Sequence, residues 1–218
     1  MTLHKVRRHI ICLIPVIVLM ALASSLFAED VVFEFDPTQT RVNYRLGDYL
    51  HGSQGIQGTF KLKSGQIHYD PATGVAGGLV VVDATSGSSG SDGRDSRMHK
   101  NILESERYPE ITFTPARVQG AVAAQGQSRV EIQGLLNLHG VDHEVTITAD
   151  VNPSGNQLIA RTQFPVPYVL WGLKNPSTFI LRVSTHVDID ITSSGRFTGL
   201  SGFRLPTMSA PVSVSGSR

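Results

Sequence analysis

The chain has 218 residues, with 19 Lys and Arg against 18 Asp and Glu, which gives a net charge of +1. Three of the basic residues lie in the first 28 positions, which hold no acid, so the remainder carries 16 against 18 and a net charge of −2. This balance excludes a strongly basic nucleic-acid surface, and we expect no nucleic-acid partner. The single Cys, Cys12, also lies in this first segment. We therefore expect no disulfide and no thiolate metal site in the rest of the chain.

The N-terminus predicts a signal peptide over residues 1–28. A basic start precedes an apolar run from Ile10 to Phe27, and small residues near the end suit cleavage after Ala28 or after Ala23. The alternative is an uncleaved anchor, but the apolar run of 18 residues is at the short end of a bilayer span and is interrupted by Pro15. We expect cleavage, a periplasmic or secreted location, and no stable membrane insertion afterwards.

From residue 31 to 82 the pattern predicts strands. Apolar and polar residues alternate through 31–35, 42–46 and 60–69, as in strands with one buried face. The continuous apolar run at 79–82 predicts a strand that is buried on both faces.

The segment that follows predicts one or two helical turns with a single apolar face. Three apolar residues recur there at a spacing of four to five: Met98, Ile102 and Leu103. Asp92 or Asp95 can cap the start, and Tyr108-Pro109 is expected to end the helix, because a residue before Pro is disfavoured in helical geometry.

The remaining chain again predicts strands. Alternation returns at 110–118, 130–138, 145–151, 158–169 and 179–191. Pro165 and Pro167 confine their strand to an edge or a bulge at that point. Residues 193–218 are rich in Gly, Ser and Pro without periodicity, which predicts a disordered tail.

Together these elements predict an all-β fold, a lipocalin-like antiparallel up-and-down barrel of about eight strands with one short helix, over residues 29–192. No βαβ pattern is present, and closure removes the exposed edges of a long sheet. An immunoglobulin-like sandwich is the alternative, but no Cys pair exists and the only Trp, Trp171, lies near the end.

Two runs of residues carry a family resemblance. The first contains Arg94-Asp95, then Ile102 to Ser105, then Tyr108 to Phe113; the second reads Gly134 to Val141 and is followed by the strand His143 to Ala149. Over roughly Val31 to Ile191 the chain resembles the YceI family of periplasmic lipid-binding proteins. The resemblance implies a lipocalin-like barrel that holds an isoprenoid or another long-chain amphiphile.

The motifs of metal and catalytic sites are weak or missing. His139 and His143 are four residues apart, but they flank a predicted turn rather than share a helix, so we expect no metal there. His99 is expected to pair locally with Asp95, four residues earlier. No Gly-x-Ser-x-Gly elbow, phosphate loop or dinucleotide fingerprint occurs, so we expect neither an enzyme nor a cofactor.

Two polar stretches stay open to two interpretations. Asp95 can cap the helix while Arg94 bonds a nearby carbonyl, or Arg94 can contact a ligand head group through its planar fork. Trp171 and Lys174 can close one end of a cavity, or they can belong to core packing beside a loop.

The function that we predict is the binding, without chemistry, of an isoprenoid or fatty-chain lipid inside the barrel. The alternatives are a structural or stress-related envelope protein that acts through its surface, and a hydrolase of amphiphiles that uses His99 or His51. The predicted cavity residues are Phe60, Tyr69, Met98, Ile102, Phe113, Phe164, Tyr168 and Trp171. The predicted head-group contacts are Arg94, His99 and Lys174.

Overall fold

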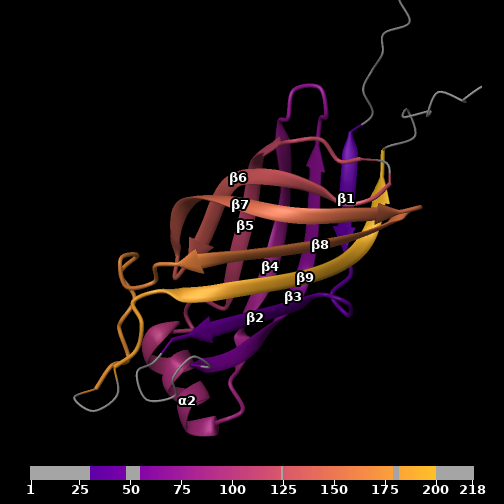
Figure 1. The fold of residues 1–218 in the computed structure, drawn as a ribbon. Helices are drawn as coiled ribbons and strands as arrows, with labels where there is room; N and C mark the ends of the chain where they lie inside the picture. Colours follow the sequence, from indigo (N-terminus) through magenta and orange to yellow (C-terminus); the bar gives the residue numbers. More distant parts are fainter. Residues whose placement is uncertain (1–29, 48–54, 124, 179–181, 200–218) are drawn as a thin grey trace, which may run out of the picture.

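The computed structural model describes residues 30–47, 55–123, 125–178 and 182–199 (Figure 1). The predicted signal peptide, His51 and residues 200–218 lie outside these ranges. The described residues form nine strands and one helical segment: β1 (Val31–Phe35), β2 (Arg41–Leu46), β3 (Ile56–Tyr69), β4 (Ala76–Ser88), α2 (Asp92–Arg97) continued by the π-helical turn η2 (Met98–Ile102), β5 (Glu110–Gln119), β6 (Ser128–Leu138), β7 (Val141–Ser154), β8 (Gln157–Val166) and β9 (Val187–Thr198).

The nine strands fill eight positions of a closed antiparallel barrel. Strands β3 to β9 pair in chain order, and both ends of this series pair with the N-terminal strands. β1 pairs with the last residues of β3 and β9, whereas β2 pairs with the first part of each. β1 and β2 therefore share one position, divided by the turn at 36–40, and the predicted lipocalin-like barrel is confirmed.

Alternation along the strands decides which side chains point inward. In β7, Ile147, Ala149 and Val151 are buried while Thr146 and Thr148 are exposed. The run at 79–82, predicted to be buried on both faces, is so only in part. Leu79 is 47% exposed, whereas Val81, on the same face of β4, is 6% exposed, and Val80 and Val82 are half-buried.

Pro165 lies at the predicted kind of place, near the end of β8, whereas Pro167 lies just beyond the strand, which ends at Val166. β7 pairs with β8 only as far as Thr162, whereas β9 continues alongside β8 to Val166. Pro165 thus lies in a stretch with a single partner strand, where a missing N–H breaks no ladder bond.

The helical segment differs from its prediction at both ends. Ser91 is the N-cap residue and forms no side-chain cap bond, while Asp95 accepts hydrogen bonds from Ser89 instead of capping the helix. The helix ends at Ile102, well before Tyr108-Pro109. Its last turn is π-helical, with the Leu103 N–H donating to the Met98 carbonyl at 2.9 Å, and this wider turn fits the apolar spacing of four to five.

The predicted boundary of the tail is also wrong. β9 continues through Ser193–Thr198, where it pairs with both β8 and β1 and closes the barrel. Ser193 is only 2% exposed, and the ring of Phe197 is 5% exposed. Ser193, Ser194 and Gly195 show no apolar period, which conceals this strand in the sequence, and an added Cβ on the inward Gly195 would come within 2.9 Å of the Phe33 ring.

Figure 1 places α2 at the end of the barrel next to β2, away from β1. Among the described residues, no helix is long and apolar enough to cross a membrane.

Candidate ligand cavity

An apolar cavity of about 270 Å³ occupies the α2 end of the barrel interior. Its walls come from β2 along its whole length, from the first residues of β3 and β9 and from the last residues of β6 and β8. On β9, Val187, Ile189 and Ile191 line it in turn, since alternate residues of a strand face the same side.

Two aromatic rings form one wall, and glycines make room for them. Tyr44 and Phe60 lie with their ring centroids 5.4 Å apart. A Cβ on Gly58 would come within 2.5 Å of the Tyr44 ring, and one on Gly87 would come within 2.5 Å of Phe60. Side chains at these two strand positions would push the rings into the cavity, so the glycines keep it open.

The helical segment covers the mouth with apolar side chains. Met98, Ile102 and Leu103 all line the cavity. π-helical turns are often found at functional sites, and here the turn brings one apolar face towards the barrel interior.

Polar groups meet the cavity at the start of α2. Ser89, Arg94, Asp95 and Arg97 belong to the lining. Arg94 donates from Nε to the Ser89 hydroxyl and from Nη2 to the Ser89 carbonyl, both at 3.2 Å. The two interpretations of Arg94 are therefore compatible, because it bonds a carbonyl and also lies at the cavity.

The Asp95 carboxylate is held in its charged form. Desolvation opposes ionisation, but the hydrogen bonds from the Ser89 hydroxyl, the Ser89 backbone and the Ser88 hydroxyl outweigh it and lower the pKa of Asp95. Burial and then the charge of Asp95 raise the pKa of Tyr44, so this phenol stays neutral beside the carboxylate. The rim thus combines one fixed anion with two guanidinium groups.

The structure brings five of the eight predicted cavity residues together at the cavity: Phe60, Met98, Ile102, Phe164 and Tyr168. The Tyr168 hydroxyl is satisfied by the Ser184 carbonyl at 2.7 Å, which leaves its ring to face the apolar space.

The other three predicted cavity residues, Tyr69, Phe113 and Trp171, do not line the cavity. Tyr69 lies at the opposite end of the barrel, because β3 is long enough to reach both ends. Phe113 is buried beside the cavity, but its ring occupies the space over Gly134. Trp171 stacks on the imidazole of His143, with centroids 4.0 Å apart and an interplanar angle of 4°.

Of the predicted head-group contacts, only Arg94 lies at the cavity. Both ring nitrogens of His99 have protein partners, the Ser105 hydroxyl at 3.1 Å and the Gly87 carbonyl at 2.8 Å. The expected pairing of His99 with Asp95 is therefore wrong as a hydrogen bond, because the ring bridges two other segments. Lys174 lies 3.9 Å from the Glu104 carboxylate instead.

Sequence reasoning missed most of the aliphatic lining and three polar rim residues, Ser89, Asp95 and Arg97. The missed residues include Tyr44, Asp95, Arg97, Leu136, Leu138 and Ile189. Inward alternation could have found the strand residues, but it applies equally to positions at the packed end of the barrel. No local signal marks Arg97 as part of the rim.

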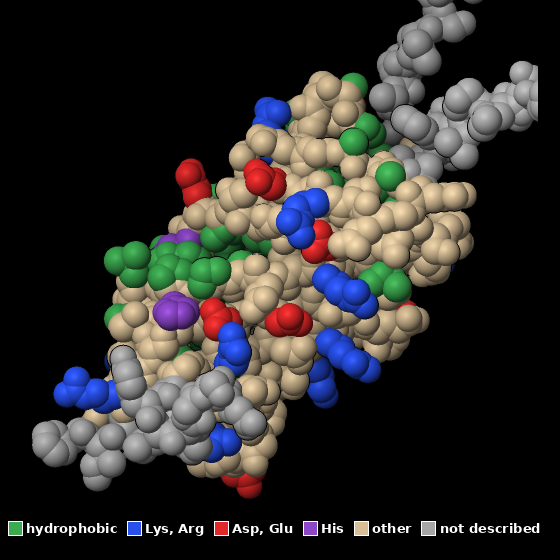
Figure 2. Space-filling view, viewed as in Figure 1, with side chains coloured by type: hydrophobic (Ala, Val, Ile, Leu, Met, Phe, Trp, Pro, Cys, Tyr) green, Lys and Arg blue, Asp and Glu red, His purple; other side chains and the backbone are tan. Residues whose placement is uncertain are grey.

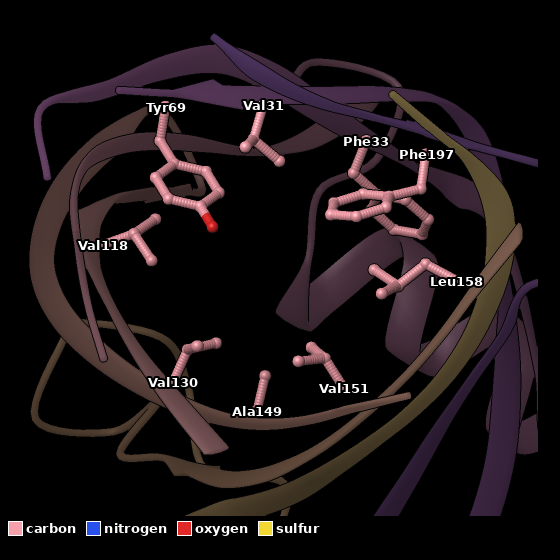
Figure 3. Packing of buried hydrophobic residues seen from close by; sticks show 9 residues of the cluster. All are labelled: Val31, Phe33, Tyr69, Val118, Val130, Ala149, Val151, Leu158 and Phe197. Carbon is pink, nitrogen blue, oxygen red and sulfur yellow. The ribbon is translucent and has the colours of Figure 1, made fainter. Parts of the chain in front are cut away.

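A packed cluster fills the opposite end of the barrel. Figure 3 shows its side chains pointing inward from strands all around the ring. It contains Val31, Phe33, Tyr69, Val118, Val130, Ala149, Val151, Leu158 and Phe197.

The outer surface that Figure 2 shows carries charges of both signs. Figure 2 shows acidic and basic side chains interspersed over the visible face, and pairs such as Arg129 with Asp150, 2.9 Å apart, bridge neighbouring strands. Within the described ranges, no group of three or more His, Cys, Asp or Glu is placed to hold a metal ion. His139 and Gly140 themselves form the β6–β7 turn, with φ of 57° and 78°, and His143 lies within β7, so the two histidines do not flank the turn as predicted.

The comparisons with known proteins agree with this geometry. A UPF0312 protein of Vibrio cholerae is 27% identical over 175 residues, which cover 77% of this chain and 87% of that protein. BcnA of Burkholderia cenocepacia has the same fold, with a TM-score of 0.61 and 18% identity over 74% of this chain and 99% of that one.

A polyisoprenoid binding domain from Saccharophagus degradans, implicated in plant cell wall breakdown, matches with a TM-score of 0.55 and 18% identity, covering 75% of this chain and 97% of that domain. The model of the YceI-like domain matches residues 33–194. The chain therefore belongs to the YceI-like family.

Proposed function

We propose that this protein is an exported carrier that holds one long apolar chain, isoprenoid or acyl, in the barrel and performs no chemistry on it. The observation that carries the proposal is the apolar cavity at the α2 end, lined on β9 by Val187, Ile189 and Ile191 and covered by Met98. Support also comes from the YceI-like fold and from the polyisoprenoid binding described for the Saccharophagus degradans domain.

Burial of the chain is sufficient to drive binding. About 15 methylene groups at about 0.8 kcal/mol each contribute a gross 12 kcal/mol or so. Association costs on the order of several kcal/mol are subtracted from this, which leaves micromolar or tighter affinity without any specific polar contact.

The head group of such a ligand belongs at the polar rim. Arg94 and Arg97 both reach the cavity lining, and guanidinium groups suit carboxylate or phosphate oxygens. The fixed charge of Asp95 offsets one of these two positive charges, so a neutral hydroxyl head group also fits the rim.

The hydrolase alternative has less support. His99, the described base that it would need, contacts Ser105 and Gly87 through both ring nitrogens. The alternative of a surface-acting envelope protein does not require the cavity, and occupancy of the cavity therefore separates it from lipid binding.

The test fills the cavity with a side chain. Ile189→Trp places an indole in the lining, and Ile159→Trp makes the same change on the outer face of neighbouring β8, where Ile159 is 43% exposed. Native mass spectrometry and titration with farnesol should show binding to wild type and to Ile159→Trp, and at least tenfold weaker binding to Ile189→Trp. Equal binding by all three would place the ligand elsewhere, and no binding by wild type would favour the surface-acting alternative.

Export is the part of the proposal that rests on the N-terminus alone, with its basic start and apolar run before Ala28. N-terminal sequencing of the protein from its source cells should begin near Ser24 or Glu29. A start at Met1 or Thr2 would indicate an uncleaved anchor instead.

A further inference from the structure

We propose that the cavity is blind and takes a chain of about three isoprene units, the farnesyl class, rather than a polyisoprenoid threaded through the whole barrel. This inference rests on the proposed function and adds a length limit to it. The limit comes from the middle of the barrel, where the side chains of three strands change from lining the cavity to filling the interior.

On the neighbouring strands β5 and β6, the change from cavity-lining to space-filling side chains occurs at the same height in the barrel. Ile111 lines the cavity, and the next inward residue, Phe113, lies across Gly134 of β6, where an added Cβ would come within 2.8 Å of the ring. Leu136, two residues further along β6, lines the cavity, while Ile132 on the other side of Gly134 packs against both buried clusters. Phe113 and Ile132 therefore form a floor.

Along β9, too, cavity-lining residues are followed by residues that fill the interior. The cavity lining ends at Ile191, Ser193 is almost fully buried, and a Cβ on Gly195 would come within 2.9 Å of the Phe33 ring. Phe197 then belongs to the packed cluster. The rings of Phe33 and Phe197 lie close together on one side of the interior (Figure 3), and they take up space that a longer chain would need.

The depth of the lining sets the length. From Val187 to Ile191 is four residue steps, or about 13 Å along the strand at roughly 3.3 Å per residue. An isoprene unit adds four main-chain carbon–carbon bonds of about 1.5 Å, which span about 5 Å in a zigzag. The cavity therefore accommodates about three units, and further units remain outside.

The experiment measures affinity along a series of prenols: geraniol, farnesol, geranylgeraniol and solanesol, titrated into the full protein in the same detergent-free carrier. From geraniol to farnesol the affinity should rise about tenfold or more, since each buried methylene contributes. From farnesol to solanesol it should change less than about threefold, because the added units stay outside the walls.

A further tenfold gain with solanesol would overturn the length limit and leave the carrier function intact. Failure of every prenol, farnesol included, would instead refute an isoprenoid as the ligand of the proposed function, and the length limit with it.

A matched pair of variants tests the floor. Phe113→Leu shortens the side chain beneath the cavity, and Phe35→Leu makes the same change in β1, where Phe35 packs against the far cluster. The affinity ratio of geranylgeraniol to farnesol should rise severalfold in Phe113→Leu and stay at the wild-type value in Phe35→Leu. An unchanged ratio in a folded Phe113→Leu protein would show that Phe113 is not the floor.

Discussion

The two ends of the barrel are built from the same alternating strands, yet one end is packed and the other holds a cavity. At the packed end, Phe33, Tyr69 and Phe197 all point inward and belong to one buried cluster (Figure 3). At the other end, the lining side chains stand apart and η2 covers the space with Met98 and Ile102. The difference teaches that an apolar inward pattern does not by itself make a binding site; the site arises where large side chains fail to meet.

The strongest way to break the packed end is to remove the end of β9. A chain that stops after Ser194 loses the residues that pair with β1, together with the buried ring of Phe197. We expect it not to fold, as judged by loss of the cooperative thermal transition in circular dichroism.

A chain that stops after Gly199 retains all of β9 and is the control for this truncation. It should melt within a few degrees of the full chain, because the segment beyond it has no periodic apolar pattern. A folded, stable protein ending at Ser194 would show that the barrel does not depend on the β1–β9 pairing.

A single substitution at the packed end should also be costly. Phe197 is 5% exposed and its neighbours are buried, so Phe197→Ala leaves a cavity that they cannot fill. We expect a loss of about 3–5 kcal/mol in the free energy of unfolding, measured by urea denaturation. A loss below about 1 kcal/mol would contradict tight packing at this end.

The same substitution at the cavity end should cost less. Phe164 is only partly buried and lines space that is already open, so Phe164→Ala removes contacts without creating a new void. We expect a loss of about 1–2 kcal/mol in the unfolding of the empty protein, together with weaker binding of farnesol. A loss equal to that of Phe197→Ala, with unchanged farnesol affinity, would mean that the two ends do not differ in packing.

The smallest predicted effect is on the pH dependence of stability, and it comes from Asp95 at the cavity rim. Hydrogen bonds from Ser89 and Ser88 outweigh desolvation and lower the pKa of Asp95 below its ordinary value of 3.8. A carboxyl with a lowered folded pKa stabilises the protein above the unfolded pKa, and this contribution is lost as the pH falls through the folded pKa.

We therefore expect the melting temperature to fall less between pH 7 and pH 3 in Asp95→Asn than in wild type, with most of the difference arising below about pH 4. Asp92→Asn, at the exposed first residue of α2, is the control and should follow the wild-type profile. Identical profiles for all three proteins would show that the Ser89 contacts do not stabilise the charged form of Asp95.

Much of the fold followed from local patterns. Alternation predicted the strands, short connections predicted neighbours in an antiparallel series, and the change of spacing at Met98 predicted the helical segment. β9 beyond Thr192 escaped prediction because Ser193, Ser194 and Gly195 show no apolar period, although the first of them is buried. Its strand character depends on pairing with β1, which is remote in sequence.

The sequence by itself determined the barrel, its family and the inward face of most strands, because these depend on residue type and period. Only the tertiary structure decided which end is open. Phe60 and Tyr69 are both aromatic and lie on one strand, yet they reach opposite ends of the barrel. Their positions differ by nine, so in a regular strand they would point to opposite faces. The register shift between Leu62 and Ser64 turns both of them inward. The cavity is thus a property of side chains that meet across the barrel from strands distant in sequence, and no local pattern encodes that distance.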